Sequence, residues 1–395
     1  MWKNVKLGDV CTITNGSTPL RKEKRYWEEG NVPWFTIDDF RVQGKNITYT
    51  QQNVTQAAVD DKKVRLVPAN SILLCCTASI GEAAIARVEM ATNQQFNALT
   101  PKSVALNSDY LYFVATTLTQ TLLSVSGSTT INFISMGKLK EISIPLPPLA
   151  EQQRIVAKLD ATFAEIDAAI TLVKETTAQS SQVYQNELSK IFKNIEDCEP
   201  RRTLKDVAKE FGRGKSKHRP RNDERLYGDK IPFIQTGNVS NAKMYVDSFD
   251  KSYSEFGISQ SKIWGKGTVC ITIAANIAEL AILDIDACFP DSVIGVYPDK
   301  EITSSEYIFY LLSFFQIYIK SKSKGSAQQN INLATFEYET FPFPSNLANQ
   351  NQIVDKLNKL QQELGLYQSL QSEKLHEMRN LKSAILAQEL QSEAA

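Results

Sequence analysis

Two patterns of hydrophobic residues alternate along the chain, and each predicts a different kind of secondary structure. Short apolar and β-branched runs, such as residues 71–77 and 268–273, are bounded by glycine, proline or asparagine and predict buried strands. After the prolines at 145–148 and 342–344, apolar residues recur instead every three or four positions. This spacing predicts a long helix after each group of prolines, because it gathers the apolar side chains into one stripe.

Both stripes are long and narrow, which is typical of helices that pair in a coiled coil. A helix of this length is longer than a small domain is wide, so we expect the two helices to pack on each other in antiparallel orientation. The alternative is that each helix lies on its own domain. The second stripe is interrupted near Lys374. The predicted seam consists of Ile155, Leu159, Phe163, Ile166, Ile170, Val173, Leu188, Ile191, Ile353, Leu357, Leu360, Leu364, Leu381 and Ile385.

The chain also repeats itself with a period of about 197 residues. Short motifs return in unchanged order: Leu7-Gly8-Asp9-Val10 returns as Leu204-Lys205-Asp206-Val207, and Ile144-Pro145-Leu146-Pro147 returns as Phe341-Pro342-Phe343-Pro344. The repeat predicts an α+β protein with two tandem similar domains, mostly β with short helices, separated and joined by the two long helices. The predicted boundaries are 1–148 for the first domain, 149–198 for the central helix, 199–346 for the second domain and 347–395 for the C-terminal helix.

Charge is distributed unevenly, although 44 basic residues balance 44 acidic ones among the 395. Residues 1–149 carry +3 and residues 201–347 carry +2, whereas residues 150–200 carry −4 and residues 348–395 carry −1. Basic residues cluster at matching places in both copies, which favours contacts with nucleic-acid phosphates over the alternative of an ordinary solvated surface. The predicted phosphate-binding residues are Arg21, Lys22, Lys24, Lys215, Lys217, Arg219 and Arg221.

The sequence predicts no catalytic, cofactor-binding or metal-binding residue in this chain. Six cysteines form no C-x-x-C pair and there are only two histidines, which argues against zinc. Residues 212–216 resemble the end of a phosphate-binding loop, but Lys209 stands where that motif needs glycine. Without a signal peptide or an apolar stretch of 18 residues, we expect a cytoplasmic protein that does not contact a membrane.

The entry into the first long helix carries a family resemblance. Pro145-Leu-Pro-Pro-Leu-Ala-Glu-Gln-Gln-Arg-Ile-Val-Ala-Lys-Leu159 is similar to the signature of specificity subunits of type I restriction-modification systems. The resemblance covers the whole chain, both copies included. In the first copy the matching motifs are Leu7-Gly-Asp-Val, Gly16-Ser-Thr-Pro, residues 30–39, Asn70-Ser-Ile-Leu-Leu, Ser79-Ile-Gly81 and Asn93-Gln-Gln-Phe96. The second copy departs from the pattern at Asn276-Ile-Ala278, Phe289-Pro-Asp-Ser292 and Pro342-Phe-Pro-Ser-Asn.

The resemblance implies that each domain is a target-recognition domain that reads one half of a bipartite, asymmetric site in double-stranded DNA. The paired helices would set the unread spacer and dock two modification subunits, which carry S-adenosylmethionine and methylate adenine. Two restriction subunits that use ATP and magnesium would be further partners, and this chain would catalyse nothing. The alternatives are a non-enzymatic coiled-coil scaffold and a DNA-binding subunit of another methylation-based defence system.

Polar residues in the loops are the candidates for reading base edges, because amides pair with adenine and carboxylates accept from cytosine. The alternative for the asparagines and threonines is a turn bond to the backbone. Trp34, Phe35, Phe96 and Phe133 are expected in the core. The base-edge candidates are Thr36, Asp38, Thr77, Ser79, Gln94, Gln95, Thr129, Thr130 and Asn132 in the first copy, and Gln235, Asn238, Asn276, Asp291, Ser292, Gln328, Gln329, Asn330 and Asn332 in the second.

Overall fold

The computed structural model describes residues 2–125, 134–196, 200–274, 277–322 and 333–391. The chain divides into two compact units, residues 1–173 with 373–395 and residues 174–372. Each unit contains one globular head and the parts of both long helices that pack near it. The long helices are α7 (Leu149–Glu196) and α12 (Leu347–Glu389).

A five-stranded sheet forms the centre of the first head, in the order β2-β9-β6-β7-β4. Four of these strands pair antiparallel, and the short edge strand β4 joins in parallel. The mixed sheet agrees with the predicted α+β class. The strands are β2 (Cys11–Asn15), β9 (Phe96–Pro101), β6 (Ile72–Cys75), β7 (Ala83–Ala86) and β4 (Asn46–Ile47).

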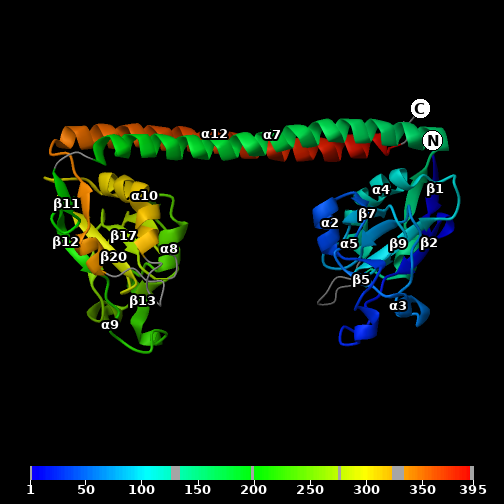
Figure 1. Cartoon of the computed structure of the whole chain (residues 1–395), viewed down its shortest axis with the longest axis horizontal. Coiled ribbons are helices and arrows are strands. Elements are labelled where there is room, and N and C mark those ends of the chain that lie inside the picture. The colour runs from blue at the N-terminus through cyan, green and yellow to red at the C-terminus, as the bar shows by residue number, and fades with distance from the viewer. Residues whose placement is uncertain (1, 126–133, 197–199, 275–276, 323–332, 392–395) are drawn as a thin grey trace. The chain divides into compact units, whose positions relative to one another are not determined.

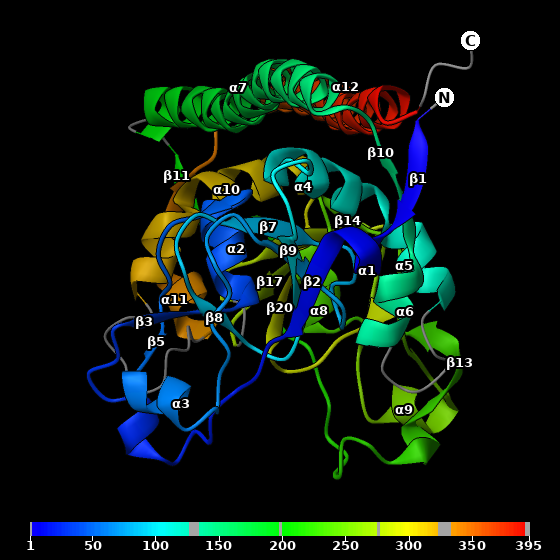
Figure 2. The same cartoon turned by 90° about the vertical axis from the view of Figure 1, so that its right-hand side faces the viewer.

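Both faces of this sheet are covered, which explains why its central strand reads as a continuous apolar run. On one face, Ile72 and Leu74 lie in a core with α4 (Ser108–Thr117) and the first turns of α7. On the other face, Leu73 shares a core with Phe35. Figure 2 shows α4 between the sheet and the long helices in this unit.

Short elements complete the first head. Strand β1 (Lys3–Lys6) pairs with β10 (Ser143–Leu146), which leads directly into α7. The others are α1 (Leu7–Val10), η1 (Lys24–Tyr26), β3 (Val32–Phe35), α2 (Ile37–Gln43), β5 (Asn53–Val54), α3 (Gln56–Asp60), β8 (Ala91–Thr92), α5 (Thr119–Val125) and α6 (Met136–Glu141).

The second head repeats the first, with its central sheet in the order β12-β20-β17-β18-β14. Helix α10 (Ser305–Lys322) takes the place of α4 between the sheet and the long helices (Figure 1). The sheet strands are β12 (Ala208–Arg213), β20 (Val293–Pro298), β17 (Val269–Thr272), β18 (Leu280–Leu283) and β14 (Tyr245–Val246). The predicted duplication is therefore confirmed at the level of strand order.

The remaining elements of the second head follow the same plan. Strand β11 (Arg201–Thr203) pairs with β21 (Thr340–Pro342), which precedes α12 as β10 precedes α7. The others are η2 (Glu224–Leu226), β13 (Tyr227–Pro232), α8 (Thr236–Asn241), β15 (Ser252–Tyr253), α9 (Glu255–Ser259), β16 (Ile263–Trp264), β19 (Ala287–Cys288) and α11 (Leu333–Tyr338).

The two long helices pair antiparallel inside each unit. In the first unit, Lys158 bonds Glu389 at 2.7 Å and Asp167 bonds Lys382 at 2.7 Å, so residue numbers fall along α12 as they rise along α7. In the second unit the same order appears, with Ser181 bonded to Gln368 at 3.1 Å and Glu187 to Lys356 at 3.4 Å. The predicted antiparallel pairing is confirmed within each unit.

Several predicted seam residues also pack on a head, so the alternative of a helix lying on its own domain holds in part. Ile155 and Leu159 belong to the core of the first head, and Leu188 and Leu357 belong to that of the second. Val173 is buried; Phe163, Ile166, Ile170, Ile191, Ile353, Leu360, Leu364 and Ile385 are partly buried.

The assignment of Leu381 to the seam was wrong, because its side chain is 51% exposed. The neighbouring residue occupies the inward face instead: the Lys382 ammonium lies 4.6 Å from the centre of the Phe163 ring and bonds Asp167. One step along a helix rotates a side chain by about 100°, which carries Leu381 out towards solvent.

Candidate nucleic-acid interface

Four loops of the first head meet beside the ends of its sheet strands. The Ser17 amide donates to the Thr92 carbonyl at 2.8 Å, and the Asn93 amide donates to Phe35 at 3.1 Å. The Cys76 amide donates to the Gln95 carbonyl at 2.8 Å. We call residues 16–23, 35–38, 76–81 and 92–95 the first loop cluster. It brings together candidates that are far apart in the sequence.

Gly16 makes this convergence possible. Its amide donates to the Phe96 carbonyl at 3.0 Å, and a Cβ atom at this position would lie 2.0 Å from the Asn93 carbonyl oxygen. No side chain fits such a close approach of two backbones. The glycine that the sequence motif contains is therefore required by packing.

The second head builds the same arrangement from different side chains. The Gly214 amide donates to Val293 at 2.9 Å, and the Ile273 amide donates to the Ser292 carbonyl at 2.9 Å. A Cβ atom on Gly214 would lie 2.2 Å from the Phe289 carbonyl oxygen. The second loop cluster consists of residues 214–223, 234–238, 273–274, 277–278 and 290–292.

The base-edge candidates of the first head fall into two groups. Asp38 and Gln94 are exposed, and Thr77, Ser79 and Gln95 are half-buried, so these five side chains can reach a ligand. The Gln94 side-chain oxygen also accepts a hydrogen bond from the Thr18 hydroxyl, and the Gln95 side-chain oxygen accepts one from the Asn93 side chain at 3.1 Å. These bonds fix the amide orientations before any ligand arrives.

Thr36 does not fit the role of a base reader, and that assignment is corrected. Its side chain is 8% exposed, and its hydroxyl donates to the Asp39 carboxylate at 3.1 Å. The Thr36 amide donates to the same carboxylate at 2.8 Å, which forms the N-terminal cap of α2. The turn chemistry considered as an alternative therefore accounts for this threonine.

In the second head the equivalent cap leaves the first residue exposed. The Asn238 side-chain oxygen accepts from the backbone amide of Gln235 at 2.9 Å, and its side-chain nitrogen donates to the Asp250 carboxylate at 3.3 Å. The Asn238 side chain is therefore used in the cap. The Gln235 side chain itself is exposed. Ser292 is half-buried in the second loop cluster, and Asp291 bonds Arg221 at 2.7 Å.

Eight base-edge candidates and one expected core residue lie outside the described part of the chain. Ile134, where the description resumes, donates from its amide to Cys76 at 3.1 Å and so lies at the first loop cluster. The other expected core residues, Trp34, Phe35 and Phe96, are buried. The residues outside the description are Thr129, Thr130, Asn132, Phe133, Asn276, Gln328, Gln329, Asn330 and Asn332.

Arg21 is held in place by aromatic rings. Its guanidinium lies 4.0 Å from the centre of the Trp27 ring and 4.7 Å from that of Trp34, and it donates to the side-chain oxygen of Gln52 at 2.7 Å. A guanidinium stacked in this way keeps its charge and loses freedom. Trp27 and Gln52 were not predicted from the sequence; the tryptophan two residues beyond the basic run was the available signal.

The other phosphate candidates differ in how they are held. Lys22, Lys215 and Lys217 are exposed, whereas Lys24 pairs with Glu28 at 3.0 Å. Arg219 donates to the backbone carbonyls of its own loop. The exposed lysines are therefore best placed to meet a phosphate.

A small aromatic pocket opens in the second loop cluster. It has a volume of about 170 Å³ and is lined by Tyr227, Phe233 and Tyr253 together with Arg221 and Gln235. The Phe233 and Tyr253 rings stack with centres 4.2 Å apart. Flat aromatic walls suit the face of a nucleobase, and the hydrogen-bonding groups beside them suit its edge. In the repeat, Trp27 and Trp34 of the first head correspond to Tyr227 and Phe233, so the two heads differ in these side chains.

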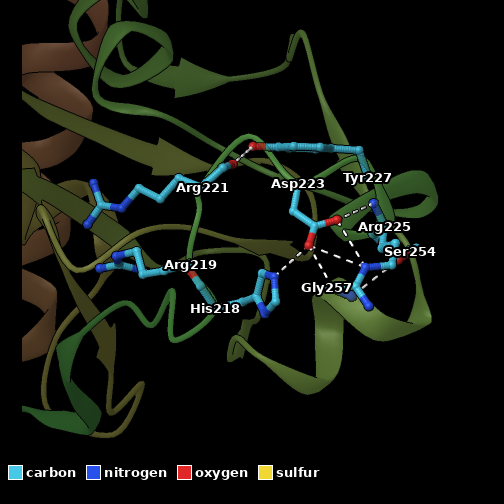
Figure 3. A network of polar contacts seen from close by, with 8 residues as sticks. All are labelled: His218, Arg219, Arg221, Asp223, Arg225, Tyr227, Ser254 and Gly257. Atoms are coloured by element: carbon cyan, nitrogen blue, oxygen red, sulfur yellow. Dashed lines mark hydrogen bonds and ion pairs between the residues drawn. The ribbon is translucent and has the colours of Figure 1, made fainter.

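The basic loop of the second cluster is fixed by one carboxylate, shown in Figure 3. Asp223 accepts from the Arg225 guanidinium at 2.8 Å and contacts the His218 ring at 2.7 Å. The Ser254 hydroxyl and the Tyr227 hydroxyl donate to backbone carbonyls of the same loop. The bonds from Arg225 and His218 hold the pKa of Asp223 well below its ordinary value.

The depressed pKa predicts that this loop is secured at neutral pH and loosens in acid. A carboxylate with a lowered folded-state pKa stabilises above its ordinary pKa of about 4, and that contribution is lost as the pH falls towards the folded value. We expect Asp223→Asn to speed amide exchange in residues 218–226 at pH 7 by roughly tenfold. Asp229→Asn, at a side chain that is 90% exposed, is the control. Equal exchange in both variants would contradict the role of Asp223.

Side chains that could bind a metal ion are dispersed among the described residues. No group of three or more histidine, cysteine, aspartate and glutamate side chains within them lies close enough to hold a metal ion. Burial raises the pKa of the Cys76 thiol to about 11, so it is not a thiolate at neutral pH. Within the same part of the chain, every helix is too short or too polar to cross a membrane.

Comparison with known proteins places the chain in a family. Residues 1–175 and 196–373 match the type I restriction modification DNA specificity domain, once in each copy of the repeat. The chain belongs to the specificity subunits of type I restriction-modification systems. The two heads of this specificity subunit therefore correspond to the two matched domains, and the family predicted from the helix entry is confirmed.

Individual relatives of the specificity subunit agree with this assignment. It is 30% identical over 288 residues to the type I restriction enzyme MjaIX specificity subunit of Methanocaldococcus jannaschii, which covers 72% of this chain and 62% of the relative. The chain thus spans less than two thirds of that relative's length.

Two of the solved structures that share the fold illustrate the likeness. One, from work on complex assembly and conformational transition of the type I R-M system, has a TM-score of 0.80 at 20% identity and covers 99% of this chain and 98% of its own. The other, the HsdS subunit from Thermoanaerobacter tengcongensis, has a TM-score of 0.60 at 18% identity and covers 98% and 96%.

Proposed function

We propose that each head binds one half of a bipartite site in double-stranded DNA through its loop cluster. The observation that carries the proposal is that both heads build the same backbone arrangement around Gly16 and Gly214 and fill it with different side chains. A shared scaffold with unlike polar surfaces suits two unlike half-sites. The exposed Gln94 and Gln235 side chains are the strongest base-edge candidates in their heads, because amides pair bidentately with adenine.

The paired helices are proposed to set the unread spacer and to dock two modification subunits. An α-helix extends 1.5 Å for each residue, so α7, with 48 residues, is about 70 Å long. A pair of antiparallel helices of this length suits the fixing of a distance along DNA. S-adenosylmethionine would be held by the modification subunits, and ATP and magnesium by two restriction subunits that join the complex. This chain would recognise DNA without catalysing a reaction.

The exposed lysines are proposed to bind phosphates without reading sequence. Lys217→Ala should weaken binding to every DNA sequence alike. A protein that makes one phosphate contact fewer releases fewer counterions from the DNA when it binds. The slope of log K against log salt should fall by about 0.9 in magnitude. Binding titrations at several salt concentrations measure this slope. Lys230→Ala, outside the loop cluster, is the control, and weakening confined to one sequence would contradict a phosphate role for Lys217.

Selection from a random DNA library tests the proposal as a whole. The chain purified with modification subunits should enrich a two-part motif with a constant spacer. Failure of the complex to enrich any motif would overturn the proposal and favour a coiled-coil scaffold.

A further inference from the structure

A fully buried glutamine lies in the first turn of each long helix. Gln152 in α7 is 0% exposed and Gln350 in α12 is 1% exposed, although glutamine is usually a surface residue. A buried amide is costly unless all its hydrogen-bonding groups are satisfied. The partners of these two side chains therefore show what they hold together.

Gln152 joins three segments of the first unit. Its side-chain nitrogen donates to the Pro147 carbonyl at 2.8 Å, in the turn before α7, and to the Ala105 carbonyl at 2.9 Å, in the loop before α4. Its side-chain oxygen accepts from the Asn107 amide at 2.8 Å. Both donors and the acceptor are used, so the amide has one orientation.

Gln350 repeats this arrangement in the second unit. Its nitrogen donates to Pro344 at 2.8 Å, in the turn before α12, and to Ile302 at 3.0 Å, in the loop before α10. Its oxygen accepts from the Thr303 hydroxyl at 2.8 Å. The side-chain nitrogen therefore has corresponding carbonyl partners in both copies, whereas the oxygen accepts from a backbone amide in one copy and from a hydroxyl in the other.

A tyrosine strengthens the same junction in each unit. The Tyr110 hydroxyl of α4 donates to the Pro145 carbonyl at 3.0 Å, and the Tyr307 hydroxyl of α10 donates to the Pro342 carbonyl at 3.0 Å. Hydrophobic contacts alone permit a helix to slide or rotate over a head, because they have no direction. Hydrogen bonds at fixed angles remove that freedom.

We infer that Gln152 and Gln350 are positioning residues that fix the direction in which each long helix leaves its head, and thereby the number of base pairs between the two half-sites. The inference rests on the proposed function. A loose junction would let one head reach half-sites at more than one spacing, whereas the bases read within each half would stay the same.

The test uses the full chain assembled with modification subunits and DNA in which the selected spacer is kept, lengthened or shortened by one base pair. Gln152→Leu and Gln350→Leu remove the bonds at similar side-chain volume. Gln153→Leu and Gln352→Leu are matched controls at exposed positions of the same helix turns. We expect the wild type and the controls to prefer the natural spacer by about tenfold or more in affinity. The two buried-site variants should lose most of that preference while selecting unchanged half-site sequences.

Gln152→Glu provides a second variant should the leucine substitution prevent folding. A glutamate keeps the shape, but its ionised form cannot donate to the two carbonyls, whereas its protonated form can donate to one. Spacer preference should therefore be weak at pH 8 and stronger at pH 5.5. A spacer preference equal to that of the wild type in all the buried-site variants would overturn the inference. Absence of a bipartite motif in the wild type would overturn the proposed function itself, and the inference with it.

Discussion

Gly16→Ala is expected to lower sequence-specific binding through the first head by about a hundredfold. The new Cβ atom would lie 2.0 Å from the Asn93 carbonyl oxygen and 2.2 Å from the Thr92 hydroxyl oxygen, so one of the two loops must move. The moved loops carry Gln94 and Gln95, and each well-placed base contact is worth about 1–3 kcal/mol of discrimination. Titration of the assembled complex with specific and scrambled DNA measures the loss.

Gly137→Ala is the matched control for this prediction. Its nearest neighbour would lie 3.9 Å from the added Cβ atom, so the substitution meets no obstacle. Binding to scrambled DNA should change little in either variant, because the lysines proposed to bind phosphates remain. Specific binding by Gly16→Ala that equals that of the wild type would show that the first loop cluster does not read DNA.

Phe192→Ala is expected to destabilise the second unit by about 3–5 kcal/mol, the usual cost of removing a buried aromatic side chain. Phe192 lies on α7 with no exposed surface, and its ring centre is 5.6 Å from that of Phe314 and 6.0 Å from that of Tyr307. Its removal leaves a cavity where the long helix meets the head. Urea denaturation followed by fluorescence measures the free energy of unfolding.

Val183→Ala serves as the control on the same helix, because the Val183 side chain is 60% exposed. Its effect should stay within about 0.5 kcal/mol. A small loss from Phe192→Ala, comparable to that of the control, would contradict the conclusion that α7 is anchored on the second head through this ring.

The fold was predictable from the sequence because its main signals are periodic or repeated. The step of four from Ile155 to Leu159, together with the prolines before them, marks the start of α7. The repeat of Leu7-Gly-Asp-Val marks the duplication. Both signals can be recognised in short stretches of sequence, because the burial of one helix face or one strand requires apolar residues at regular positions.

The candidate site was less predictable because it depends on which polar groups satisfy each other in three dimensions. Thr36 and Gln235 occupy corresponding cap positions, yet only Gln235 remains exposed. Asp291 was expected to read a base. In the structure its carboxylate forms an ion pair with Arg221. The buried Gln152 and the exposed Gln153 are adjacent and identical, so only the fold distinguishes them.

The two heads are proposed to read different halves of one DNA site, and a comparison of the recognition motifs of two variants separates their contributions. The recognition motif should be determined by methylation mapping for complexes that carry the wild type, Gln94→Ala or Gln235→Ala. We expect a two-part motif in which Gln94→Ala relaxes a position in one half and Gln235→Ala relaxes a position in the other. A single continuous motif, or loss of preference in the same half for both variants, would contradict it.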